Sequence, residues 1–243
     1  MADGSSRSEN LREAVAGLDA DVIGLQEVDR SQPRSGLADQ TAVVAEALGA
    51  RWFRFVPAVD GTPGETWTPS SADDGATTTG PTYGVGLVSR LPVLACHVRR
   101  FGPAPLGLPL YVPGNRGLTM VPDEPRVALA AVVESPRGPM TVITTHLSFV
   151  PGWNVKQLRD LVGWAASMPG PRVLMGDFNL PGAVPRVVSR WHQVLRGPTY
   201  PSWGPRVQLD HVLTDVPLPV TGARVQKLTV SDHCAAVVDI ADE

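Results

Sequence analysis

The chain has 243 residues, of which 43% are hydrophobic and 19% are charged. The hydrophobic fraction suffices for a sizeable core and excludes an intrinsically disordered chain. The length fits one large domain. The net charge of −3 excludes a broad basic coat for non-specific binding of nucleic acid. The 24 Gly and 24 Pro residues indicate many turns and short elements.

Cysteines and long apolar segments are scarce. Cys96 and Cys234 are too few for a disulfide framework or a zinc cluster. The sequence lacks a run of about 18 apolar residues, which a membrane-spanning helix needs, and its first residues are polar rather than an apolar leader. We therefore expect a reduced, cytoplasmic monomer without stable membrane insertion.

Hydrophobic periodicity and turn residues predict the elements. A capping box at 6–9 opens a first helix, and further helices are predicted over 39–48, which Gly49 ends, and 155–168. Strands are predicted at 22–25, 52–56, 85–89, 93–100, 127–133, 140–145, 172–176, 208–214, 224–229 and 235–240. Residues 61–81 are predicted to form a long surface loop, and 102–125 a second irregular stretch. Since no linker or repeat interrupts this order, we predict one domain, residues 1–243, of mixed sheets with helices outside.

Several apolar strands are bordered by polar, metal-competent residues, at the sheet ends where rigid scaffolds present functional side chains. Carboxylates and an amide, with few thiols, favour a hard ion such as Mg²⁺ or Mn²⁺ over zinc. Histidines are then available for acid–base work, and this set suits hydrolysis of a phosphate ester. The polar residues concerned are Gln26, Glu27, His146, Asp177, Asn179, Asp210, His211, Asp232 and His233.

Six segments occur in a characteristic order along nearly the whole chain. They are LQEVDR (25–30), YGVGLVSRLPV (83–93), TTHLS (144–148), GDFNLPG (176–182), LDHVL (209–213) and SDH (231–233). In this order they resemble the endonuclease/exonuclease/phosphatase family, which includes DNase I, abasic-site exonucleases, neutral sphingomyelinases and inositol-polyphosphate 5-phosphatases. The resemblance implies an α/β (α+β) fold, a four-layer αββα sandwich of two packed mixed β-sheets.

The resemblance also implies roles for single residues. Glu27 would be the chief metal ligand, and Asp232 would lie at the metal, directly or through water. Asp177 would orient or deprotonate the attacking water, Asn179 would hold the phosphate, and His146 would donate to a non-bridging phosphate oxygen.

We expect different roles for the remaining histidines. His233 would be an acid–base or charge-stabilising group, a choice that the sequence leaves open, and Asp210 would fix its tautomer. His211 points to the opposite face of a regular strand, where packing is expected. His97 and His192 match no motif and are expected to be structural or exposed.

Three secondary candidates stay open between functional and structural roles. Arg126 precedes a strand, and it would lie near the phosphate or form a surface salt bridge. Asn154, Gln157 and Arg159 lie on the helix after TTHLS, where a solvated face is favoured over a role in orienting loops. Residues 198–203 would supply an aromatic wall, although aromatics in Pro-rich loops more often pack beneath the loop.

One departure from the family pattern stands out. Family members usually begin with a strand ending in Asn, in a run like T-x-N-I, and this Asn helps to bind the metal. No such strand precedes Ser6, and Asn10 lies within the first predicted helix. We therefore expect unpaired backbone groups and an apolar gap in the sheet.

The expected function is a Mg²⁺- or Mn²⁺-dependent phosphoesterase that cleaves a phosphodiester by in-line attack of water. Nucleic acid, a phospholipid head group and a small phosphodiester or phosphomonoester all remain open as substrates. The alternative is a catalytically impaired binding module or a truncated remnant. A Ser or Cys nucleophile is disfavoured because no G-x-S-x-G is present and neither Cys lies in a catalytic motif.

Overall fold

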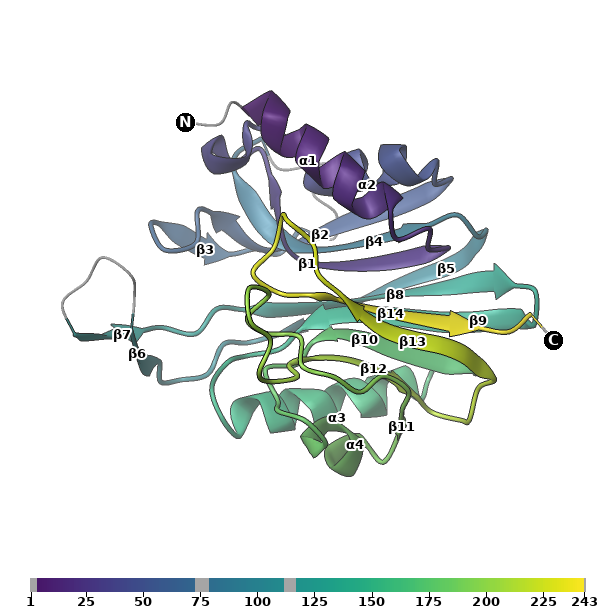
Figure 1. Ribbon diagram of the computed structural model, residues 1–243. Helices are drawn as coiled ribbons and strands as arrows, with labels where there is room; N and C mark the ends of the chain where they lie inside the picture. Colours follow the sequence, from purple (N-terminus) through teal and green to yellow (C-terminus); the bar gives the residue numbers. More distant parts are fainter. Residues whose placement is uncertain (1–3, 73–78, 112–116, 243) are drawn as a thin grey trace.

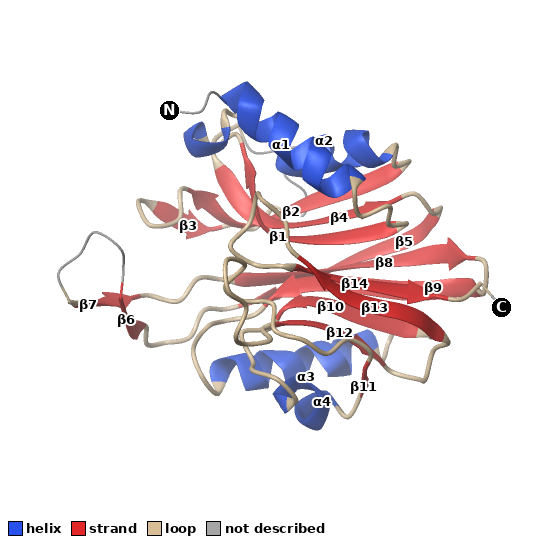
Figure 2. Cartoon of the chain, in the orientation of Figure 1, coloured by secondary structure: helices blue, strands red, loops and turns tan. Residues whose placement is uncertain are grey.

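The computed structural model describes residues 4–72, 79–111 and 117–242. In this part of the chain, two α-helices, a four-stranded sheet, a six-stranded sheet and two further α-helices follow one another as layers (Figure 1). Figure 2 shows the helices on the two outer faces and the strands between them. The expected four-layer sandwich is therefore confirmed.

The helical layers contain α1 (Gly4–Ala16) and α2 (Gln40–Leu48) on one side, and α3 (Trp153–Ala165) and α4 (Val184–Ser189) on the other, with a 3-10 turn at Pro33–Ser35. The first sheet has the order β1 (Val22–Arg30), β4 (Thr82–Ser89), β2 (Trp52–Gly61), β3 (Trp67–Pro69). The second has the order β11 (His192–Gln193), β12 (Asp210–Thr214), β10 (Arg172–Asp177), β9 (Gly138–His146), β8 (Arg126–Ser135), β5 (Val93–Phe101). Two hairpins stand apart, β6 (Leu108–Tyr111) with β7 (Leu118–Val121) and β13 (Val220–Gln226) with β14 (Ala235–Ile240). The second sheet is mixed, as expected, because β9 and β10 run parallel. The expectation of a mixed sheet is wrong for the first sheet, whose described pairs are all antiparallel.

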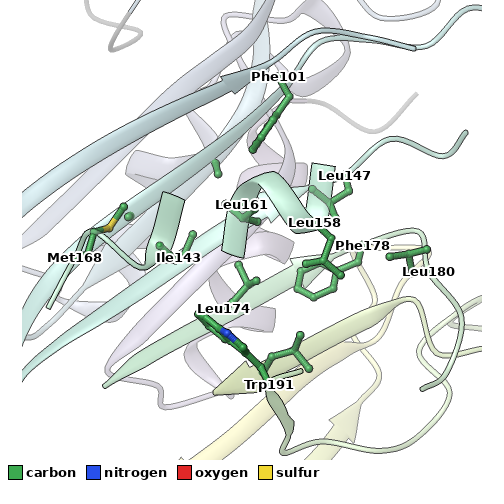
Figure 3. Close-up of a cluster of buried hydrophobic side chains, with 14 residues drawn as sticks. Phe101, Ile143, Leu147, Leu158, Leu161, Met168, Leu174, Phe178, Leu180 and Trp191 are labelled. Atoms are coloured by element: carbon green, nitrogen blue, oxygen red, sulfur yellow. The ribbon is translucent and has the colours of Figure 1, made fainter. Parts of the chain in front are cut away.

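Three apolar clusters hold the layers together. Leu87 and Leu129 belong to the cluster between the two sheets, and both are fully buried. Leu158 and Leu161 of α3 pack with Phe178 over the outer face of the second sheet (Figure 3). The third cluster lies between α1, α2 and the first sheet and contains Val15, Leu18, Ile23, Val44, Ala45, Leu48, Val88 and Val237.

Local signals explain where α2 begins and ends. The side chain of Asp39 accepts a hydrogen bond from the Ala42 N–H at 3.0 Å, which caps the helix. Gly49 follows the helix with φ of 62°, the left-handed conformation that glycine adopts readily. The predicted helix over 39–48 is thus confirmed to within one residue.

Other predicted boundaries are wrong. Residues 61–81 are not a loop throughout, because β3 pairs with β2, and the stretch 102–125 contains the β6–β7 hairpin. Residues 73–78 and 112–116 of these stretches lie outside the described residues. The first helix already includes Gly4, so it begins before the capping box, and α4 was not predicted.

The expected gap in the sheet is present between β1 and β14. Within the described ranges, β4 is the strand partner of β1 and β13 is that of β14. The other edge of β1 makes one isolated bridge, between Arg30 and Asp39, and is otherwise without a strand partner, as is one edge of β14. A cavity of about 620 Å³ lies between them, and its lining includes Leu11, Val15, Leu25, Met175 and Val237. The described residues contain no helix that is long and apolar enough to cross a membrane.

Candidate active site

Strand pairing gathers three of the expected site residues at one end of the second sheet. Because β9 and β10 are parallel, their carboxyl ends coincide, and His146 lies opposite Asp177 in the register. The neighbouring strand β12 is antiparallel and begins there, so that Asp210 lies opposite Asp177 on the other side. Three motifs that are distant in sequence therefore bring their side chains next to one another at this end of the sheet.

Unusual backbone conformations shape the motifs themselves. Gly176 has a φ of 141°, and a Cβ at this position would lie 2.0 Å from the Thr145 carbonyl oxygen, so the GDFN motif needs glycine here. Asn179 has a φ of 50°, and its N–H donates to Asp177 Oδ1 at 2.8 Å. Glu27 has a φ of 56° at a bulge of β1, and its side chain is 59% exposed. The strand edge thereby presents the Glu27 carboxylate outward.

Five ionisable side chains form a continuous row. Asp210 Oδ2 lies 2.8 Å from His233 Nδ1, and His233 Nε2 lies 3.9 Å from Asp177 Oδ2. The same Asp177 oxygen is 3.6 Å from His146 Nε2, whose ring Nδ1 is 3.7 Å from Glu27 Oε1. Residues from five separate motifs therefore meet in one chain of contacts, which we call the acid–histidine row.

Burial and neighbouring charges set the protonation states in this row. Burial lowers the pKa of His233, but the hydrogen bond and charge of Asp210, with the charges of Asp177 and Asp232, outweigh it and raise this pKa to about 9. Burial and then the charge of Asp210 raise the pKa of Asp177 to about 7. Burial, followed by the nearby cationic groups, lowers the pKa of His146 well below 6.5. His233 is therefore cationic and His146 neutral at pH 7.

Arg126 belongs to the site rather than to the surface. It is 4% exposed, its Nη1 lies 3.2 Å from His146 Nδ1, and its Nη2 contacts Asp123 Oδ1 at 3.3 Å. Asp123 also accepts from Ser148 Oγ at 2.7 Å. Asn179 Nδ2 lies 3.1 Å from the other His146 ring nitrogen. Because arginine can only donate, Nδ1 is the accepting nitrogen of the neutral His146 ring and Nε2 carries its proton.

Three residues close to the row could not be identified as site residues from the sequence: Asp123, Tyr83 and Glu124. Asp123 lies in a stretch without periodicity, so no pattern marked it. Tyr83 stands inside a quoted motif, but only the fold shows that burial, with the charges of Glu27 and Glu124, raises its pKa well above 10. The pKa of Glu124 is raised as well, chiefly by burial.

Two polar residues of α3 support the site from behind. Asn154 Nδ2 donates to the Asn179 carbonyl at 2.9 Å, and Gln157 Oε1 accepts from the Ser148 N–H at 2.8 Å. Both side chains are buried, so the expected solvated face is wrong for them, whereas Arg159 is exposed as expected. These bonds tie the loops that carry the site to the helix.

The other candidates lie outside the row. Asp232 is exposed and lines the same cavity as Glu27. His211 is fully buried and stacks on Phe178 at 5.4 Å between ring centroids, as expected for a packing residue. Trp203 is 71% exposed, so the expected packing beneath the loop is wrong for this side chain. His97 and His192 are exposed.

Oxygen donors could hold a cation beside the row. No group of three His, Cys, Asp or Glu side chains in the described ranges forms a metal cluster. This arrangement is compatible with Mg²⁺, which is commonly bound through one or two carboxylates and keeps several waters. The exposed Glu27 carboxylate at the end of the row is the residue best placed for such a ligand.

The chain matches known proteins in family and in fold. A sequence model of the Endonuclease/Exonuclease/phosphatase family matches residues 2–233, although no curated protein matches the sequence. Among solved structures, an endonuclease/exonuclease/phosphatase from Bacteroides vulgatus has 15% identity and a TM-score of 0.64, covering 98% of this chain and 90% of its own.

Two further solved structures are of proteins with a named activity or bound molecule. Bacteroides thetaiotaomicron mannosyl-6-phosphatase has 15% identity and a TM-score of 0.59, covering 98% of this chain and 91% of its own. D. rerio TDP2 complexed with a single-strand DNA product has 17% identity and a TM-score of 0.59, covering 95% and 89%. At this identity the solved structures show a shared fold, while the match to the family model extends over nearly the whole chain. The chain therefore belongs to the endonuclease/exonuclease/phosphatase family, whose members are hydrolases that act on phosphate esters.

Proposed function

We propose that this protein is a Mg²⁺- or Mn²⁺-dependent phosphodiesterase in which water attacks phosphorus in line. The acid–histidine row carries the proposal, because it places a base, two histidines and an exposed carboxylate in succession, with each group within 3.9 Å of the next. A phosphate bound against this row would meet donors for its oxygens and an acceptor for the proton of the attacking water.

Asp177 is the proposed general base. A pKa of about 7 keeps a substantial fraction of this carboxylate ionised at neutral pH and gives it the affinity to take a proton from water. The bond from the Asn179 N–H holds one of its oxygens, which fixes the carboxylate while the other oxygen faces His146 and His233.

His233 is the proposed stabiliser of developing charge. As a cation it has no free lone pair to accept a proton, so its raised pKa supports stabilisation or proton donation over base catalysis. Asp210 binds Nδ1 and leaves Nε2–H directed toward Asp177 and the space in front of it. Asn179 and neutral His146 would donate to the non-bridging oxygens of the phosphate.

The proposed cation would be held by Glu27, and by Asp232 directly or through water. When bound, a divalent ion polarises the phosphoryl oxygens as a Lewis acid. The donor set supports the choice of ion, since it consists of oxygens and leaves both cysteines outside the row. A phosphodiester is our first choice of substrate, and a phosphomonoester stays within the same chemistry. The DNA product and the phosphatase activity named above belong to those proteins.

Hydrolysis of bis-p-nitrophenyl phosphate tests the proposal. Purified chain would be assayed in EDTA and again with Mg²⁺ or Mn²⁺ restored, beside Asp177→Asn and the matched surface control Asp160→Asn. We expect turnover that depends on the metal, that falls by about 10² or more in Asp177→Asn, and that is unchanged in the control. Equal turnover by wild type and Asp177→Asn would refute the role of the row, and a folded wild type without turnover would favour the binding-module alternative.

A further inference from the structure

The loop formed by residues 198–203 is fixed beside the acid–histidine row. Ser202 donates its backbone N–H to the Asp232 carbonyl oxygen at 2.6 Å. The Thr199 hydroxyl accepts from the Asp210 N–H at 3.1 Å. The loop is therefore bonded to Asp210 itself and to the residue before His233, and its backbone holds a defined position relative to the reaction centre.

Two aromatic rings extend from His233 toward solvent. The Tyr200 ring lies 4.8 Å from the His233 ring between centroids, and Tyr200 meets the Trp203 ring at 6.4 Å in an edge-on arrangement. Trp203 stands in a tight turn closed by the bond from the Gly204 N–H to the Pro201 carbonyl at 3.0 Å. The indole is thus only two ring contacts from the charged histidine.

Exposure distinguishes Trp203 from an ordinary packing residue. The side chain is 71% exposed although it is large and apolar, so most of its ring surface remains in water. A flat group placed on this ring would remove apolar surface from water and gain stacking contacts. Every nucleobase and aryl ring has such a face, whereas a methyl or sugar group does not.

We propose that Trp203, oriented by Tyr200, is a stacking platform for a planar group that the substrate carries next to its phosphate. This inference rests on the proposed function, because it takes the phosphate to bind at the acid–histidine row. The substrate class would then be a phosphate ester of a nucleoside or of an aromatic alcohol. Trp203 is linked to His233 through the Tyr200 ring and lies outside the row, so it would govern affinity for the substrate and not the chemical step.

Calorimetric binding of small phosphates tests the platform without any turnover. The ligands form two matched pairs, adenosine 5′-monophosphate with ribose 5-phosphate, and phenyl phosphate with methyl phosphate, each titrated in Mg²⁺. For wild type we expect the planar member of at least one pair to bind about 10- to 100-fold more tightly. In Trp203→Ala this preference should vanish, while Trp203→Phe should keep most of it.

The pairs also identify the planar group, since a preference in the first pair indicates a nucleobase and one in the second alone indicates a small aryl ring. Phe53→Ala, which removes another exposed aromatic from β2, should leave both ratios unchanged. Three results would overturn the inference. The first is a ratio of affinities near one within both ligand pairs in wild type, and the second is no measurable binding of any ligand. The third is equal ratios in wild type and Trp203→Ala. Hydrolysis of bis-p-nitrophenyl phosphate that still depends on Asp177 would then show that the platform alone has failed.

Discussion

The His233–Asp210 pair predicts how the stability of the metal-free protein changes with pH. The pKa of His233 is about 9 in the folded chain, against 6.5 for an ordinary histidine. A raised folded pKa means that the folded state binds the proton more tightly, so the contribution is complete below pH 6.5 and is lost as the pH rises through 9. The difference between these two pKa values contributes about 3 kcal/mol to the free energy of unfolding at pH 6 and about 2 kcal/mol at pH 7.5. The contribution falls to nearly zero at pH 9.5.

Urea unfolding in EDTA at pH 7.5 and pH 9.5 measures this contribution. His233→Gln removes the titrating ring. The free energies of unfolding of wild type and variant should therefore differ by about 2 kcal/mol less at pH 9.5 than at pH 7.5. This range starts above the Asp177 pKa of about 7, which limits the contribution of that carboxyl to the change. His192→Gln, at the other end of the β12 pairing, is the matched control and should follow wild type. A difference between wild type and His233→Gln that is independent of pH would refute the assigned pair.

Three further predictions concern backbone, core and metal. Gly176→Ala should destabilise the fold by about 1–3 kcal/mol because its Cβ would meet the Thr145 carbonyl; an unchanged urea midpoint would contradict this. Leu158→Ala should cost about 2–5 kcal/mol in the same assay because the side chain is fully buried, and a loss below 1 kcal/mol would contradict that packing. Glu27→Gln should raise the Mg²⁺ concentration for half-maximal hydrolysis about 10-fold or more while leaving thermal unfolding in EDTA unchanged, because the side chain is exposed; an unaltered titration would remove Glu27 from the metal site.

The sequence was most informative where a local pattern coincided with a packed layer. The α3 residues at helical spacing, such as Leu158 and Leu161, lie in the core as their periodicity predicts. The motifs at strand ends contain the five residues that meet in the row, whereas Asp232 of the SDH motif lies outside it. Their order along the row depends on strand register, which places His146 and Asp210 on either side of Asp177.

Features without a local pattern could not be predicted. Asn154 and Gln157 look like solvent-facing helix residues, because a polar side chain that binds loop backbone has the same periodicity as one that binds water. The exposure of Trp203 depends on bonds between its loop and the SDH segment, which are distant in sequence. The contact between Arg126 and His146 depends in the same way on the pairing of β8 with β9.

The open edges of β1 and β14 also determine how this chain behaves at high concentration. A strand edge with free N–H and C=O groups is a template for a strand from another molecule. Proteins usually block such edges with lysine, proline or inward-pointing charge. β14 carries one charged residue, Asp239, and the charged residues of β1 all lie in its second half, so that residues 22–26 carry no such block. The pairing groups that flank the cavity thus favour self-association as the protein concentration rises.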